Sequence, residues 1–225
     1  MPFKLVKVEK EEDFSSILNS PVWSTPFTAV DLETTGSQPP EDRIIEIGAV
    51  RVEKLKIVDT FRTFVNPERG VPPFIIRLTG ISESDLESQE KIEKTLPGFM
   101  NFLGGSVIAA HHAPFDFKFL ESEVWRVKRH RLNNPVVCTC KLARRILAFL
   151  PSKGLDSVTR FLGITVNGRH RALGDAEATA KLLIIFQQYL MSRDIVTVRQ
   201  LLEYQDSKIE DYKPSTNGNH KYAVG

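Results

Sequence analysis

Hydrophobic and polar positions change their period along the chain, and these changes predict an alternation of strands and helices. Residues 27–32 form a short apolar and β-branched run between Pro26 and a Thr/Gly/Pro-rich segment, which predicts a buried strand. Two longer runs, 43–54 and 56–66, follow with only a short Lys-Leu-Lys segment between them, which predicts a β-hairpin. Three consecutive strands with tight connections indicate antiparallel neighbours at the start of a sheet.

Helical spacing dominates the rest of the chain, with two short apolar runs inside it. Ser82 precedes acidic residues, as a capping serine does at the start of a helix, and Pro114 stands in the first turn of another predicted helix. The order of elements indicates an α/β domain over about 26–191, with a mixed sheet and helices on both faces. After the first three strands, the predicted elements are strands at 106–112 and 135–139 and helices over 82–88, 91–105, 114–130, 141–150, 156–164 and 174–190.

The two ends of the chain differ from this central domain. Residues 1–25 carry an acidic run and a Pro/Ser/Thr-rich end, and we expect an N-terminal extension with a short helix and a loop. Residues 192–225 are polar, and their last part lacks any core-forming pattern. We therefore expect a C-terminal tail that is partly disordered and that serves as a docking segment for a partner.

Composition narrows the classes of protein without assigning a function. The 225 residues carry a net charge of +2, so a polyanion must be bound by a local site rather than by bulk charge. No apolar run approaches the roughly 20 residues of a membrane span, and the N-terminal residues lack the apolar core of a signal sequence. The chain has only two cysteines, Cys138 and Cys140, which suits a reducing compartment. We expect a cytoplasmic protein with no membrane partner, in which both cysteines pack as small apolar residues.

Paired carboxylates stand at the end of the first predicted strand. Asp31 and Glu33 are two residues apart, so their side chains point to the same face of the sheet, at the strand end where α/β sheets bind ligands. Carboxylates that share a buried face repel each other, and a divalent cation relieves the repulsion. The alternative is a helix cap at Asp31 beside a solvated Glu33, and this segment alone leaves both explanations open.

Two further acids stand at the starts of predicted helices. Asp116 and Asp175 each fall in a first helical turn, where the helix dipole favours a carboxylate in any case. His170 precedes Asp175 in the adjoining loop. Four carboxylates with no cysteine partner suit two Mg²⁺ or Mn²⁺ ions, which activate water and stabilise a leaving oxygen when about 3.5–4 Å apart. With a histidine as the base, the set predicts metal-assisted hydrolysis of a phosphodiester.

Three motifs in this order resemble those of the DEDDh 3′→5′ exonucleases: DLETTG at 31–36, HHAPFD at 111–116 and HRALGDA at 170–176. The sequence is most similar in this respect to the proofreading epsilon subunit of bacterial DNA polymerase III and to the exonuclease segment of PolC-type polymerases. The resemblance extends over roughly 26–190. It implies an RNase H-like fold with a central mixed sheet of about five strands, which agrees with the predicted order of elements.

The resemblance also implies a role for each site residue. Asp31, Glu33 and Asp175 would hold the cation that binds the attacking water. Asp31 would bridge to a second cation, whose shell Asp116 would complete, and His170 would be the general base. A close backbone approach to the sugar would explain the glycine in the first motif. The residues implied to line the pocket for the 3′-terminal nucleotide are Leu32, Thr34, Thr35, Gly36 and His111.

Two positions depart from the family pattern. Ser37 stands where family members often carry a leucine that wedges against the terminal base, so that wedge is in doubt. His112 replaces an asparagine in the second motif. Because oxygen ligands already account for the cations, we expect His111 and His112 to line the pocket rather than to bind metal.

The expected function is a 3′→5′ exonuclease that trims single-stranded or frayed 3′ ends of DNA and releases nucleoside 5′-monophosphates. The alternative is an RNA exonuclease of the RNase T or oligoribonuclease kind, since the same residues hydrolyse either sugar. A chain of 225 residues has no room for a polymerase domain, so proofreading requires a polymerase partner, which the segment 192–225 would bind. A HAD-type phosphatase is excluded because the second acid is Glu33 rather than aspartate. A non-catalytic nucleic-acid clamp is disfavoured because all five catalytic positions are intact.

Overall fold

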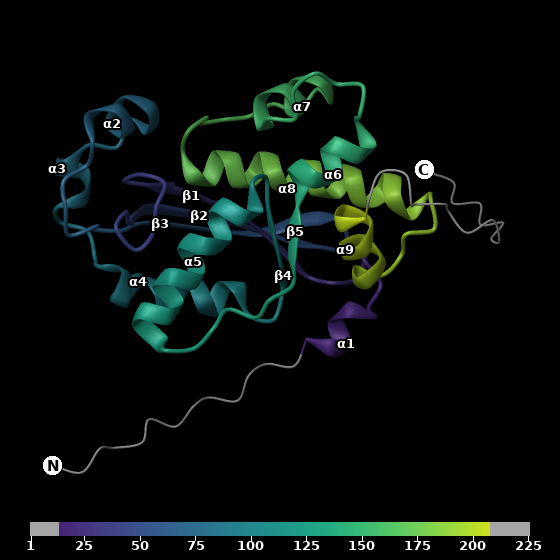
Figure 1. Ribbon diagram of the computed structural model, residues 1–225, viewed down its shortest axis with the longest axis horizontal. Helices are drawn as coiled ribbons and strands as arrows, with labels where there is room; N and C mark the ends of the chain where they lie inside the picture. The colour runs from purple at the N-terminus through teal and green to yellow at the C-terminus, as the bar shows by residue number, and fades with distance from the viewer. Residues whose placement is uncertain (1–13, 208–225) are drawn as a thin grey trace, which may run out of the picture.

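A five-stranded mixed sheet forms the centre of the domain (Figure 1). The computed structural model describes residues 14–207. In the sheet, whose order is β3-β2-β1-β4-β5, β2 pairs antiparallel with β1 and β3, whereas β4 pairs parallel with β1 and β5. The predicted hairpin and the antiparallel start of the sheet are therefore confirmed. The strands are β1 (Phe27–Thr34), β2 (Ile44–Glu53), β3 (Lys56–Phe64), β4 (Val107–Ala110) and β5 (Val136–Cys138).

Helices cover both faces of the sheet, as the sequence predicts (Figure 1). On one face, side chains such as Phe27 and Ala29 of β1 pack with Phe186 of α8. On the other face, Val30 of β1 packs with Phe119 of α5. No helix within the described residues is long and apolar enough to span a membrane. The helices are α1 (Ser15–Leu18), α2 (Pro73–Thr79), α3 (Glu83–Leu86), α4 (Ile92–Leu103), α5 (Ala113–Lys128), α6 (Thr139–Ile146), α7 (Leu155–Phe161), α8 (Ala172–Met191) and α9 (Val198–Asp206).

The packed domain continues past the boundary predicted at residue 191. Val198 and Leu201 of α9 are fully buried in the same cluster as α8, so this part of the predicted tail belongs to the core. Gln205 accepts a hydrogen bond from the Cys138 N–H at 2.8 Å and donates one to the Val136 carbonyl at 2.9 Å. It thereby satisfies backbone groups at the edge of the sheet. The remainder of the predicted tail, 208–225, lies outside the described residues.

The N-terminal side is fastened to the same region. The predicted short helix is present as α1, and the Val22 N–H donates to the Val196 carbonyl at 2.8 Å. The earlier part of the expected extension, 1–13, lies outside the described residues. The segment 14–25 is thus part of the packed domain rather than an extension separate from it.

The start of α8 lies directly against β2. A Cβ at Gly48 would overlap the backbone of Ala172 and Leu173, so only a glycine allows this approach. Two positions away on β2, Glu46 is fully buried and accepts a hydrogen bond from the Ala172 N–H at 3.1 Å. The side chain of Arg171 also bonds to Glu46, at 3.2 and 3.3 Å. These contacts fix where α8 begins over the sheet.

Candidate active site

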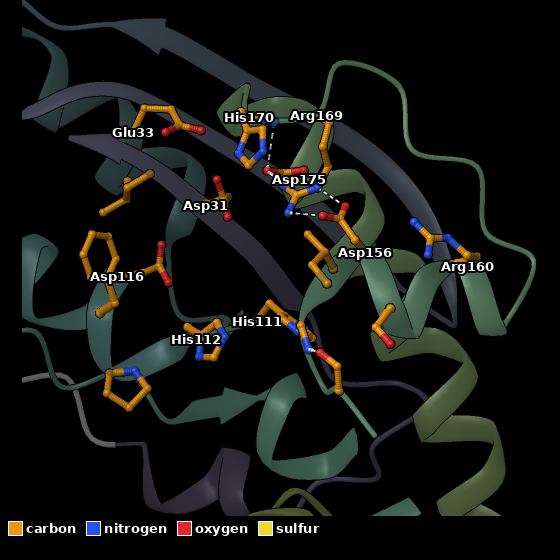
Figure 2. A pocket seen from close by; sticks show the side chains of 17 residues that line it. Asp31, Glu33, His111, His112, Asp116, Asp156, Arg160, Arg169, His170 and Asp175 are labelled. Atoms are coloured by element: carbon orange, nitrogen blue, oxygen red, sulfur yellow. Dashed lines mark hydrogen bonds and ion pairs between the residues drawn. The ribbon is translucent and has the colours of Figure 1, made fainter. Parts of the chain in front are cut away.

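A cavity of about 950 Å³ opens at the carboxyl end of β1 (Figure 2). Its walls come from β1, the junction of β4 and α5, the start of α7 and the loop before α8. Segments far apart in the sequence therefore meet at one place. The polar residues that line it include Asp31, Glu33, His111, His112, Asp116, Ser152, Asp156, Arg160, Arg169, His170 and Asp175.

The four predicted carboxylates converge on this cavity. One carboxylate oxygen from each of Asp31, Glu33 and Asp175 lies within 4.8 Å of the other two. Asp116 lines the cavity from the first turn of α5 and repels the charge of Asp31. Figure 2 shows the carboxylates of Asp31 and Asp116 facing the same space. The alternation along β1 and the first turns of α5 and α8 thus bring together the acids that the sequence singled out.

Burial and mutual repulsion make these carboxyl groups hold their protons. Burial raises the pKa of Asp31 well above its ordinary value, and the charges of Asp116 and Asp175 raise it further. Burial is also the largest cause of the raised pKa of Glu33, about 7, and of Asp116, about 8. For Glu33, the charges of Asp175 and Glu46 add to the effect. The cluster therefore lacks the positive charge needed to keep all its carboxylates ionised at neutral pH.

The surroundings of Asp175 fit a cation. Its Oδ1 is buried and has no hydrogen-bond partner among the described residues. Its Oδ2 accepts the Arg169 guanidinium, which also pairs with Asp156, and the His170 N–H at 3.2 Å. A buried carboxylate oxygen without a donor costs free energy unless a cation or donor reaches it. Together with Asp31 and Glu33, it offers the hard oxygen ligands that Mg²⁺ and Mn²⁺ prefer.

His170 lines the cavity next to Asp175. Its φ of 57° lies in the left-handed region, which few non-glycine residues adopt. Its backbone N–H donates to Asp175, and the charge of its side chain acts on the same carboxylate. Figure 2 shows the imidazole beside Asp175, at the end of the cavity where Glu33 lies. The side chain is thus located beside the carboxylates, as a general base must be.

The predicted nucleotide-pocket residues divide into two groups. Leu32 and His111 line the cavity, whereas Thr34, Thr35 and Gly36 do not. Thr34 and Thr35 are buried and bond within the adjoining loop, where the Thr34 hydroxyl donates to the Gly36 carbonyl at 2.5 Å. Their contact with a terminal nucleotide stays a prediction.

The glycine of the first motif has a local explanation that the sequence did not reveal. The Asp42 carboxylate fills the space that a Cβ at Gly36 would occupy. Close packing within the protein is therefore one reason for a glycine at position 36, and the predicted approach to a sugar stays a prediction. The neighbouring Ser37 is also held in place, because its carbonyl accepts a hydrogen bond from Lys118 of α5 at 2.6 Å.

Sequence reasoning missed four charged residues that belong to this site. Arg169 and Asp156 form the ion pair beside Asp175, and Arg160 lines the cavity farther along α7. Glu46 of β2 holds the start of α8 through its bonds to the Arg171 side chain and the Ala172 N–H. Arg169 could have been noticed because it precedes His170. Its ion-pair partner, Asp156, lies 13 residues earlier, in α7, so the pair cannot be recognised from the sequence.

The carboxylate cluster, the cavity and the sheet together define the class to which this chain belongs, the RNase T exonuclease family. The family model, described as an exonuclease, matches residues 28–183. The family resemblance and the RNase H-like fold expected from the motifs are confirmed.

Two kinds of DNA polymerase III component are among the proteins that this chain resembles. The PolC-type DNA polymerase III of Clostridium perfringens is 40% identical over 185 residues, which are 82% of this chain and 13% of that one. The epsilon subunit of DNA polymerase III of Aquifex aeolicus is 37% identical over 158 residues, 70% of this chain and 78% of that one. The chain therefore spans only a small part of the PolC-type relatives.

Solved structures of exonucleases share the fold. Exonuclease X in complex with 5′-overhanging duplex DNA superposes with a TM-score of 0.66 at 27% identity, covering 80% of this chain and 99% of that chain. The nuclease domain of 3′hExo, a DEDDh family member bound to rAMP, superposes with a TM-score of 0.65 at 22% identity, covering 76% and 95%. The likeness to 3′hExo concerns the fold alone.

The raised pKa values predict how the stability of the metal-free protein depends on pH. In the unfolded chain the pKa of Asp116 is near its ordinary 3.8, whereas in the fold its pKa is about 8. Between these values the native state binds more protons than the unfolded state, so the free energy of unfolding falls as pH rises. Melting temperatures measured in EDTA should therefore decrease between pH 5 and pH 8, and less steeply in Asp116→Asn. The same pH dependence in both proteins would contradict the raised pKa.

Proposed function

We propose that this chain is a 3′→5′ exonuclease that hydrolyses the terminal phosphodiester of single-stranded DNA and releases nucleoside 5′-monophosphates. The observation that carries the proposal is the convergence of ligand atoms from Asp31, Glu33 and Asp175 within 4.8 Å at the floor of an open cavity. The family supports a nuclease activity. The relatives named as DNA polymerase III components favour DNA over RNA.

Different residues of the cavity have different roles in the proposed reaction. Asp31, Glu33, Asp116 and Asp175 would hold two Mg²⁺ or Mn²⁺ ions, which when bound supply an activated water and neutralise charge on the leaving oxygen. His170 accepts the proton of the attacking water, since an imidazole is an effective base near neutral pH. Arg160 supplies a positive charge along the cavity for a phosphate of the substrate strand.

We further infer a role beside a DNA polymerase, in proofreading or in trimming 3′ ends during repair. The support is the identity to two kinds of DNA polymerase III component. The docking role inferred for 192–225 then falls on the residues after 207, because α9 uses Val198, Leu201 and Gln205 to pack against the domain.

Product analysis on matched substrates tests the proposed reaction. The protein with Mg²⁺ or Mn²⁺ is incubated with labelled single-stranded DNA, duplex DNA and RNA of the same sequence. We expect stepwise shortening of single-stranded DNA from its 3′ end, with nucleoside 5′-monophosphates as products. EDTA should abolish the reaction, and added Mg²⁺ should restore it. Faster degradation of RNA would assign the site to RNA, and no release from any substrate would refute a nuclease.

The base assignment has its own test. His170→Ala should lower kcat by about 10²–10⁴-fold, the usual contribution of a positioned general base, with little change in KM or in melting temperature. His130→Ala is a matched control, because His130 bonds to the Arg131 carbonyl and does not line the cavity. Near-wild-type turnover in His170→Ala would remove His170 from the mechanism.

A further inference from the structure

A second group of potential metal ligands lies beside the carboxylate cluster. One ligand atom from each of His111, His112 and Cys140 lies within 4.8 Å of the other two. Both histidines line the cavity, and Cys140 is buried, with 2% of its surface exposed. Mixed imidazole and thiolate ligands favour Zn²⁺ over Mg²⁺, which takes oxygen ligands. The group therefore differs in chemistry from the four carboxylates.

The hydrogen bonds of His111 hold its ring as a metal ligand is held. A carbonyl can only accept, so Nε2 is the protonated nitrogen that donates to the Lys153 carbonyl at 2.8 Å. Histidines that bind metals almost always donate their other ring N–H to such a group. Nδ1 then carries the lone pair, which faces the Thr139 hydroxyl at 2.9 Å. That hydroxyl has a second acceptor, the Ala110 carbonyl at 3.4 Å, so it is not left unpaired if Nδ1 binds an ion instead.

At neutral pH, His111 is already in its metal-binding form, whereas Cys140 must lose a proton when an ion binds. Burial lowers the pKa of His111 to about 4, so its imidazole is neutral and offers a lone pair at pH 7. Burial raises the pKa of the Cys140 thiol, whereas a hydrogen bond from Arg144 favours the thiolate. The other cysteine, Cys138, is engaged differently, because its thiol donates to the His111 carbonyl at 3.4 Å.

We propose that His111, His112 and Cys140 form a second metal site, which binds one Zn²⁺ ion and is separate from the carboxylate centre. Ligands of a tetrahedral zinc ion are roughly 3.5 Å apart, so three ligand atoms within 4.8 Å of one another need only small side-chain movements to share an ion. On binding, the sulfur–zinc bond forms as the thiol proton leaves to solvent, with no change of oxidation state. His112 is exposed and lines the cavity, so solvent would supply the fourth ligand.

The ion would link two elements that hold the site together. His112 is the N-cap of α5, whose first turn carries Asp116, and Cys140 lies in the first turn of α6. Zinc bound there fastens the start of α5 to the start of α6. The proposal goes beyond the exonuclease reaction and does not depend on it.

Cobalt serves as the probe, since Co²⁺ occupies zinc sites and a cobalt–thiolate bond gives a charge-transfer absorption that oxygen ligands do not. Metal-free, reduced full-length protein is titrated with CoCl₂ in excess Mg²⁺, which occupies the carboxylate centre. We expect the thiolate band to saturate at one equivalent, and one equivalent of Zn²⁺ to remove it. No thiolate band at stoichiometric Co²⁺, or a band abolished by Mg²⁺, would overturn the proposal.

Variants assign the band to the three side chains. Cys140→Ala should abolish it, while the matched variant Cys138→Ala and the carboxylate variant Asp31→Asn should retain it. Because His112 is exposed, His112→Asn leaves the core intact and should weaken cobalt binding by at least about tenfold. Loss of the band in Cys138→Ala or Asp31→Asn, or unchanged cobalt affinity in His112→Asn, would show that the ion binds at another site. Melting in EDTA confirms that each variant is folded.

Discussion

The burial of four acidic side chains beside one another is the constraint on which the rest of this structure depends. Asp31, Glu33 and Asp175 bring ligand oxygens within 4.8 Å of one another, and Asp116 adds a fourth acid to the same cavity. Such a cluster is unfavourable by itself, because burial raises the pKa of each group, and neighbouring carboxylates raise the pKa of Asp31, Glu33 and Asp116 further. Its persistence requires a rigid frame that forces the acids together, and its chemistry requires positive charge. The cluster thereby joins the fold to the proposed exonuclease reaction.

The frame is the junction of α8 with the sheet. Gly48 allows the backbone of α8 to touch β2, and buried Glu46 holds the Arg171 side chain and the first N–H of α8. Asp175 follows within the first turn and is therefore carried to the end of β1. Glu46 is fully buried and needs these partners, because a buried carboxylate without donors or a cation is costly. Arg169 stabilises the charge of Asp175, but one oxygen of that carboxylate has no hydrogen-bond partner within residues 14–207.

Local sequence patterns predicted those features of the site that depend on a single strand or a single helix start. The two-residue spacing of Asp31 and Glu33 fixed their common face, and helix-start signals located Asp116 and Asp175, so the site could be assembled from strand and helix ends. Contacts between distant segments have no such signature. The burial of Glu46 under α8 depends on how the helix crosses β2. The helix α9 was missed although its sequence carries helix signals, a capping box of Thr197 and Gln200 and the apolar residues Val198 and Leu201 at helical spacing. The grouping of the second-motif histidines with Cys140 likewise arises only from the fold.

Proton release on cation binding measures directly whether buried, repelling carboxyl groups form the reactive centre. At pH 7 the carboxyl groups of Asp116 and Glu33, with pKa values of about 8 and 7, retain protons in the metal-free protein. Calorimetric titration with Mn²⁺, in two buffers of different ionisation enthalpy, gives the number of protons displaced. The account predicts a release of about one proton or more per chain, reduced in Asp116→Asn. Binding of Mn²⁺ without proton release, or an equal release from the variant, would contradict it.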